Sequence, residues 1–259
     1  MLLTAPPGNR ASAALLEAVV AAEAVAAADP ASLGLTPAGR RSALEAYATE
    51  IAPCARCRLA EGRTQVVFGT GDPDANLMFI GEAPGFHEDK QGFPFVGQAG
   101  KLLDKLLGGI GLAREDVYIA NVIKCRPPGN RDPQADEIEA CEAHLFRQLE
   151  LVEPRLVATL GNFATKLLTG KPHGITRVHG RPQEATVGGR TVTLYPLYHP
   201  AAALYTPAML RTLEEDFAGI PALIGEEPAP AAAAEVIRFP VSAASAVATP
   251  PQQQQLGLF

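Results

Sequence analysis

The chain has 259 residues, of which 47% are hydrophobic and 19% charged, and its formal net charge is −6. This length allows one well-packed hydrophobic core, and the acidic balance argues against a nucleic-acid-binding surface that is basic throughout. No run of about 18 strongly apolar residues occurs, and the N-terminus lacks the basic start and leucine-rich core of a signal peptide. We therefore expect a soluble cytoplasmic protein that does not span a membrane.

The two ends of the chain differ in composition from its middle. Residues 1–41 are dominated by alanine, and residues 225–254 by alanine, proline, valine and glutamine. Such segments bury too little apolar surface to offset the loss of chain entropy on folding. We interpret residues 1–41 as a flexible extension and residues 225–254 as a disordered linker, which leaves residues 42–224 as the folded domain.

Apolar strands and amphipathic helices alternate along this domain. Strands are predicted over residues 76–81, 116–125 and 155–161, and a hairpin turn at Gly188-Gly189 lies within a segment, residues 184–200, that ends in a strand. Helices are predicted over residues 42–52, 99–111, 134–152, 162–170 and 206–224. The alternation indicates a mostly parallel sheet covered by helices on both faces, and ligands of such sheets bind beyond the carboxyl ends of the strands.

Two segments with acidic, aromatic or histidine side chains lie at these predicted strand ends. GEAPGFHEDKQGFPFVG (residues 81–97) follows the first strand, and HPAAALY (residues 199–205) follows the last. Asn121 lies in the second strand among apolar residues, where an amide is disfavoured unless it is hydrogen-bonded. We expect these three segments to meet in one site.

Four cysteines, Cys54, Cys57, Cys125 and Cys141, all fall within the predicted domain. The first two form a Cys-x-x-Cys motif, and four thiolates together can complete one tetrahedral metal site. Zinc and an iron-sulfur cluster both accept four thiolates. Spacing alone does not choose between them, although zinc sites are the commoner of the two.

Taken in order, the motifs resemble the family 4 uracil-DNA glycosylases, the iron-sulfur type of bacteria and archaea. The resemblance covers residues 42–224 and rests on CARC, GEAPGFHEDKQGFPFVGQAG, ANVIKCRPPGNRDP, Cys141 and LYHPAAAL. It implies a three-layer α/β/α sandwich with a short, mostly parallel central sheet. It also implies a monomeric bacterial enzyme, acting at the nucleoid, that removes uracil from DNA by hydrolysing the N-glycosidic bond. By the same resemblance the four cysteines hold a 4Fe-4S cluster rather than zinc.

Recognition of a flipped uracil requires a stacking surface and a group that reads the base edge. Phe95 can supply the stacking face, although a core phenylalanine is the alternative interpretation. The Asn121 amide offers one donor and one acceptor, which match uracil O4 and N3–H and oppose the pattern of cytosine. The resemblance places Glu88 where thymine's 5-methyl group is excluded.

Bond cleavage requires donors for the departing uracil anion and a positioned water. His199 precedes a proline at the end of the last strand and can donate to uracil O2 as negative charge develops there. The backbone amide of Ala83 can reach the same oxygen. Family 1 enzymes of the wider superfamily carry an aspartate at the position of Ala83, so Glu82 or the backbone is expected to position the water here.

Contacts with the rest of the DNA are predicted for two kinds of residue. Leu204 or Tyr205, after His199, is expected to fill the gap that the flipped base leaves, by analogy with family 1. Basic residues in two loops are candidate phosphate contacts: Lys124, Arg126 and Arg131, with Asn130, in the first, and Arg177 and Arg181 in the second.

Residues Gln255–Phe259, QLGLF, resemble the short peptide by which bacterial repair proteins dock on the sliding clamp. The preceding linker would tether the enzyme to that partner.

Two other functions fit parts of the pattern. A relative that becomes covalently trapped on uracil-containing DNA uses a histidine in an inserted basic loop, but the loop RPPGNRDP after Cys125 has none. A catalytically silent iron-sulfur DNA-binding module would not need Glu82, Phe95, Asn121 and His199 together, so their joint presence favours an enzyme.

Overall fold

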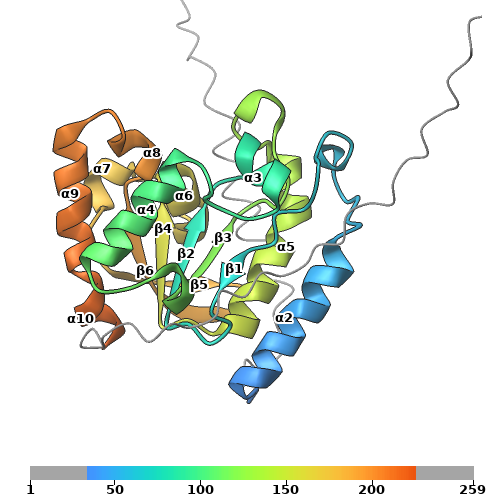
Figure 1. The fold of residues 1–259 in the computed structure, drawn as a ribbon, viewed down its shortest axis with the longest axis horizontal. Helices are drawn as coiled ribbons and strands as arrows, with labels where there is room; N and C mark the ends of the chain where they lie inside the picture. Colours follow the sequence, from blue (N-terminus) through green and yellow to red (C-terminus); the bar gives the residue numbers. More distant parts are fainter. Residues whose placement is uncertain (1–33, 226–259) are drawn as a thin grey trace, which may run out of the picture.

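The computed structural model describes residues 34–225 (Figure 1). The first helix of the described residues, α2 (Pro37–Ile51), begins before the predicted residue 42. The reason lies in its N-terminus, where the Thr36 hydroxyl accepts a hydrogen bond from the Gly39 amide at 3.1 Å and Pro37 occupies the first turn. Both features stabilise a helix start.

Six strands form one sheet in the order β1-β3-β2-β4-β6-β5. Their bounds are β1 Thr70–Gly71, β2 Leu77–Gly81, β3 Tyr118–Asn121, β4 Leu156–Leu160, β5 Gln183–Val187 and β6 Arg190–Leu197. The four inner strands pair in parallel, and the two edge strands are antiparallel to their neighbours. The mostly parallel sheet and the hairpin at Gly188-Gly189 are confirmed, whereas β1 was not predicted.

The helices fall largely where the sequence predicts them. Beyond α2 they are α3 Phe86–Gln91, α4 Gln98–Gly109, α5 Ala135–Val152, α6 Asn162–Thr169, α7 Ile175–Val178, α8 Pro200–Ala203, α9 Pro207–Ala218 and α10 Ile220–Ile224, with 3-10 turns at Arg58–Ala60, Arg114–Asp116 and Pro128–Asn130. The prediction missed α3, α7 and α8, and it joined α9 and α10 into one helix. It also extended the second strand to residue 125, whereas the chain leaves the sheet after Asn121.

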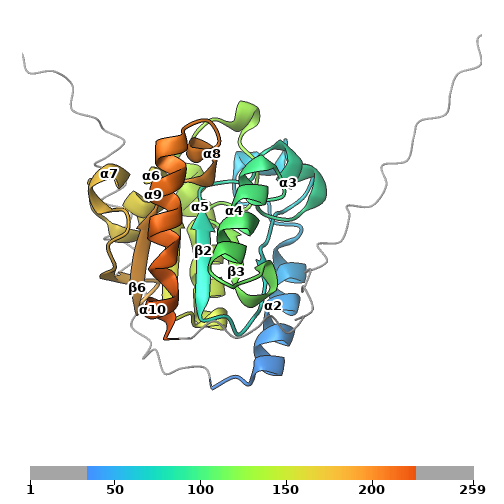
Figure 2. The ribbon, with the colours of Figure 1, turned by 60° about the vertical axis from the view of Figure 1, so that its left-hand side comes forward.

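Alternate side chains of the four inner strands enter different hydrophobic cores on the two faces of the sheet. In β2, Met78 and Ile80 pack in the core that contains α2, α5 and α6, whereas Leu77 and Phe79 pack against α4, α9 and α10. Figures 1 and 2 show these helices on opposite sides of the strands. The three-layer α/β/α sandwich is therefore confirmed.

The parallel strands all end at the same edge of the sheet. Their last residues are Gly81, Asn121, Leu160 and Leu197. Figure 2 shows β2 pointing toward the end of the molecule where α3 and α8 lie. Among the described residues, no helix is long and apolar enough to cross a membrane.

Candidate active site

Gly81, the last residue of β2, provides the space in which two candidate site residues meet. A Cβ atom at this position would lie 2.4 Å from Asn121 Oδ1 and 2.7 Å from Phe95 Cζ. Both contacts are shorter than a carbon atom allows, so only glycine fits here without rearrangement. The parallel register pairs Gly81 with Asn121, which brings the amide to this point from β3.

Phe95 also lies against His199. Their rings are stacked, with centroids 5.6 Å apart and planes inclined by 28°. Gly161, after β4, packs closely against the histidine, because a Cβ there would lie 3.1 Å from His199 Cβ. Residues after β2, at the end of β3 and after β6 therefore converge, as the sequence predicted.

The Asn121 side chain is buried, with 2% of its surface exposed, and its Oδ1 atom has no hydrogen-bond partner within the described residues. A buried carbonyl oxygen without a donor costs free energy, on the order of 1–3 kcal/mol. The orphaned oxygen therefore indicates that a ligand supplies the missing donor.

His199 is held as a neutral ring with a defined tautomer. Its Nδ1 accepts a hydrogen bond from the Ala201 amide at 3.1 Å, at the start of α8. Burial lowers its pKa from 6.5 to about 4, although the nearby Glu88 carboxylate acts in the opposite direction. With Nδ1 as the acceptor, the neutral ring carries its hydrogen on Nε2 and can donate it to a ligand.

Glu88 holds the loop that carries Phe95. Its Oε1 accepts hydrogen bonds from the amides of Val96 and Gly97, both at 3.0 Å. This carboxylate therefore braces the loop, a role that the sequence did not reveal, in addition to the methyl exclusion that the resemblance implies for it.

Glu82 and Ala83 follow Gly81 directly and so lie at the same strand end. Glu82 is half-buried, and burial, with a smaller contribution from Asp132, raises its pKa to about 6. A carboxyl group with a pKa near neutrality can exchange a proton with water at physiological pH. Ala83 is also half-buried and packs against the core.

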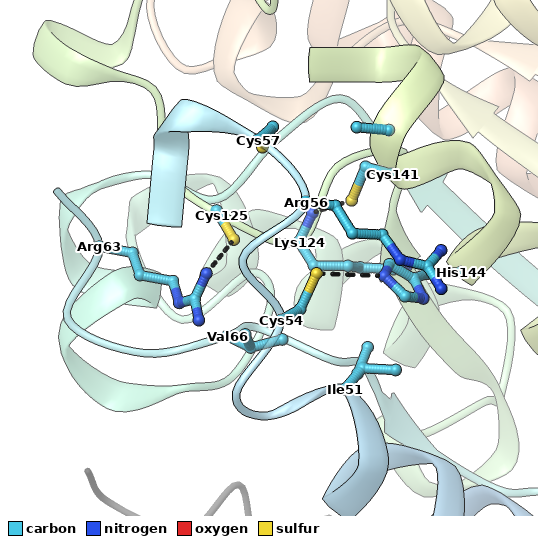
Figure 3. Close-up of a pocket in the computed structure, with 11 residues that line it drawn as sticks. Ile51, Cys54, Arg56, Cys57, Arg63, Val66, Lys124, Cys125, Cys141 and His144 are labelled. Carbon is cyan, nitrogen blue, oxygen red and sulfur yellow. Dashed lines mark hydrogen bonds between the residues drawn. The ribbon is translucent and has the colours of Figure 1, made fainter. Parts of the chain in front are cut away.

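The four cysteines form a second centre on the α2 and α5 side of the sheet. Cys54, Cys57, Cys125 and Cys141 line one pocket, shown in Figure 3. Three N–H groups point at their sulfur atoms: Arg63 Nη1 at 3.5 Å from Cys125 Sγ, the Lys124 amide at 3.3 Å from Cys141 Sγ, and His144 Nε2 at 3.5 Å from Cys54 Sγ. Donors of this kind suit metal-bound thiolates.

His144 is oriented for this contact. The Tyr47 hydroxyl lies 2.7 Å from His144 Nδ1, and burial lowers the pKa of His144 to about 4. Because burial also raises the pKa of Tyr47 to about 12, the tyrosine keeps its proton and donates it to Nδ1. The remaining Nε2–H of the neutral ring then faces Cys54. No local pattern in the sequence indicates this arrangement.

Lys124 tests whether an anionic group fits the cysteine pocket. Its side chain is 1% exposed, and Nζ donates to the Asn121 carbonyl at 2.7 Å and to Gln148 Oε1 at 2.5 Å. These partners are neutral, burial lowers the Lys124 pKa to about 8, and the charges that oppose this shift are those of Cys141 and Cys125. Thiolates bound to metal would supply that negative charge, so the donor set fits such a group.

The number of cysteines in this pocket limits the kinds of metal group that they can bind. Across residues 34–225 no three His, Cys, Asp or Glu side chains are placed to bind one metal ion together. Ligands of a single zinc ion must all lie at about 2.3 Å from it, whereas each cysteine of an iron-sulfur cubane binds a different iron. The four cysteines that line this pocket match the four irons of such a cluster in number, and they also match the four positions of a zinc site.

The residues predicted to contact DNA differ in their exposure to solvent. The prediction for Lys124 was wrong, because this side chain is buried and turned toward Asn121 and Gln148. Arg131 is partly exposed and forms two hydrogen bonds with the buried Glu137 carboxylate, at 2.8 and 2.6 Å. Arg177 is exposed.

The surface near α3 and α8 carries two exposed aromatic rings. Arg126 lies over the ring of Phe86, 5.1 Å from its centroid, and Phe86 is 45% exposed. Tyr205 is 89% exposed, whereas the neighbouring Leu204 is half-buried. Tyr205 is thus the more accessible of the two residues predicted to enter the DNA, and Phe86 was not predicted.

The chain matches known proteins over the same region. The uracil DNA glycosylase superfamily matches residues 68–218. The type-4 uracil-DNA glycosylase of Sulfurisphaera tokodaii is 47% identical over 67% of this chain and 81% of its own length. The type-4 enzymes of Saccharolobus solfataricus and Archaeoglobus fulgidus are each 45% identical over 71% of this chain, covering 88% and 94% of their own lengths.

We predict that His199 stays neutral in the folded protein until the pH approaches 4, because burial lowers its pKa from 6.5 to about 4. The unfolded chain binds this proton at a higher pH than the folded protein does. His199 therefore lowers the free energy of unfolding as the pH falls from 6.5 to about 4, and it has no such effect above pH 6.5. Imidazole 15N NMR, with H199Q to assign the signal, should show a neutral ring protonated on Nε2 at pH 6. A protonation midpoint near 6.5 would contradict the prediction.

Proposed function

Because this chain belongs to the uracil-DNA glycosylase superfamily, and within it to the type-4 enzymes, we propose that it excises uracil from DNA and so begins base-excision repair. The observation that carries the proposal is the orphaned Oδ1 of Asn121, beside the stacked rings of Phe95 and His199. A uracil base offers the N3–H donor that this oxygen lacks.

Base selection follows from the polarity of this amide. With Oδ1 accepting from uracil N3–H, the Asn121 amide nitrogen faces O4 as a donor. Cytosine presents an acceptor at N3 and an amino group at C4, so both contacts would become repulsive. The buried position of Asn121 makes such a mismatch costly, because the wrong base leaves polar groups unpaired away from water. Phe95 supports the base by stacking.

The N-glycosidic bond breaks as electrons move into the uracil ring, and negative charge develops on O2. His199 can meet this charge with its Nε2–H, since Nδ1 is fixed as the acceptor of the Ala201 amide. A neutral donor of defined orientation stabilises the leaving anion without reorganising during the reaction. The backbone amide of Ala83 is the second proposed donor.

Water then adds to the sugar carbon. We assign Glu82 to hold this water, because its half-buried carboxyl has a pKa raised to about 6 and follows Gly81 directly. A sugar cation needs only a weakly activated nucleophile, so a single carboxylate is sufficient. Glu88 keeps its proposed role beside the base, where it excludes a 5-methyl group and braces the loop of Phe95.

Contacts outside the site involve residues at the same end of the molecule. Arg126, Arg131 and Arg177 are the proposed phosphate contacts, and Leu204 or Tyr205 the proposed wedge. The exposure of Tyr205 supports the tyrosine as the side chain that enters the duplex.

The four cysteines are proposed to hold a 4Fe-4S cluster. Three N–H···S contacts and the buried Lys124 cation support the assignment. The cluster would join the segment after α2, the loop after β3 and α5 into one structural unit. It takes no part in the steps above.

The clamp-binding peptide Gln255–Phe259 lies outside the described residues and stays a proposal from the sequence, as do the linker and the N-terminal extension. Docking on a sliding clamp would bring the enzyme to the DNA of the bacterial nucleoid.

We expect the purified chain to release uracil from a uracil-containing oligonucleotide, leaving an alkali-labile site. Replacement of His199 by alanine should lower the excision rate by roughly 10²- to 10³-fold, the effect of losing one such donor. Asn121→Ala should lower it similarly and weaken discrimination against cytosine. His173→Ala alters an exposed histidine and serves as the control. Equal rates for H199A and H173A would refute the assignment.

Anaerobically purified protein should be brown, absorb near roughly 400 nm through thiolate-to-iron charge transfer, and contain iron and sulfide in equal amounts. Cys141→Ala should lose that absorbance. A colourless protein that binds one zinc ion per chain would contradict the cluster.

Deletion of residues 255–259 should abolish binding to a bacterial sliding clamp in a surface-plasmon experiment, while excision from a short oligonucleotide stays at the full-length rate. Undiminished clamp binding by the truncated chain would disprove the docking peptide.

A further inference from the structure

The backbone at Phe95 adopts a conformation that its side chain does not favour. Its φ angle is 53°, in the left-handed region, and Phe95, Asn130 and Glu153 are the non-glycine residues with positive φ in the described part of the chain. A bulky residue stays in this region only where its surroundings hold it there. Asn130 and Glu153 lie at turns and helix ends, whereas Phe95 lies in the proposed base site.

Arg114 holds this conformation from outside the site. Its Nη1 donates to the Pro94 carbonyl at 3.1 Å, and its Nη2 donates to the Phe95 carbonyl at 2.6 Å. Two donors of one rigid guanidinium therefore bind two successive carbonyls, which fixes the orientation of the peptide between them.

A third contact fixes Arg114 itself. Its Nε donates to Asp104 Oδ1 at 2.9 Å, from the solvent-facing side of α4. The Arg114 side chain is 18% exposed and the Asp104 side chain 50% exposed. The ion pair with Asp104 is thus largely open to water and is expected to contribute little stability by itself.

Gly100 of α4 lies against the same Phe95 carbonyl. A Cβ at this position would lie 1.7 Å from the Phe95 carbonyl oxygen. The helix backbone therefore lies directly against the carbonyl that Arg114 binds. The Phe95 carbonyl therefore has both the α4 backbone and the guanidinium beside it.

We propose that Arg114 is a positioning residue for the base site, which keeps Phe95 in its left-handed backbone conformation so that the ring faces uracil. The inference rests on the proposed function, because it names what orients the stacking ring. Without the two hydrogen bonds, the Phe95 backbone is free to relax to negative φ and the ring turns away from His199 and Asn121.

The test compares Arg114→Met with Arg114→Lys and Asp104→Ala in the full-length, cluster-loaded protein. R114M removes both carbonyl contacts, R114K keeps a charge but cannot bridge two carbonyls, and D104A keeps the guanidinium and both carbonyls. The readouts are the excision rate, the inhibition constant of free uracil, and the affinity for an oligonucleotide with an abasic site.

We expect R114M to bind free uracil about 10- to 100-fold more weakly and to lose excision rate by a similar factor, because a small displacement of a positioning group has effects of this size. R114K should be intermediate and D104A close to wild type. Affinity for abasic-site DNA should change less than twofold, because that ligand has no base to stack on Phe95.

Three results would overturn the inference. One is an inhibition constant of uracil for R114M that equals the one for D104A. Another is a loss of affinity for uracil and for abasic-site DNA by the same factor, which indicates general loss of structure. If R114M does not fold, R114K provides the test. An inhibition constant of uracil for R114K that equals the wild-type value would then overturn the inference. Failure of the wild-type protein itself to excise or bind uracil would instead refute the proposed function.

Discussion

The proposed active site depends on the close packing at Gly81, where the parallel strands end. The absence of a side chain lets the Asn121 amide from β3 and the Phe95 ring from the following loop occupy the same small region. A carbon atom at Gly81 would displace both. The proposed reading of uracil, the stacking on Phe95 and the contact with His199 all follow from this one position, because His199 is in turn stacked on Phe95.

One buried lysine connects this site with the cysteine pocket. The Lys124 ammonium donates to the carbonyl of Asn121, and the Lys124 amide donates to the sulfur of Cys141. Gln148 extends the network to the Phe68 carbonyl and the Tyr118 hydroxyl, at 2.8 and 3.0 Å. The backbone that carries the proposed base-reading amide is therefore tied to the segment that carries the proposed cluster ligands.

The sequence was sufficient for the layers of the fold and for the gathering of Phe95, Asn121 and His199 at the strand ends, because apolar periodicity and polar residues at strand ends are local signals. It was insufficient where distant segments decide the outcome. Lys124 stands among basic residues and was predicted at the surface, but the chain bends after Asn121 and turns it inward. The strained backbone of Phe95 depends on Arg114 and Gly100, which no local pattern around Phe95 indicates.

The most direct test of this account is a crystal structure of the full chain with free uracil. The account predicts that the base stacks on Phe95, that Asn121 Oδ1 accepts from N3–H, and that His199 Nε2 donates to O2. It also predicts that the backbone of Phe95 keeps its positive φ. A uracil bound elsewhere, or an Asn121 Oδ1 that remains without a donor in the complex, would contradict it.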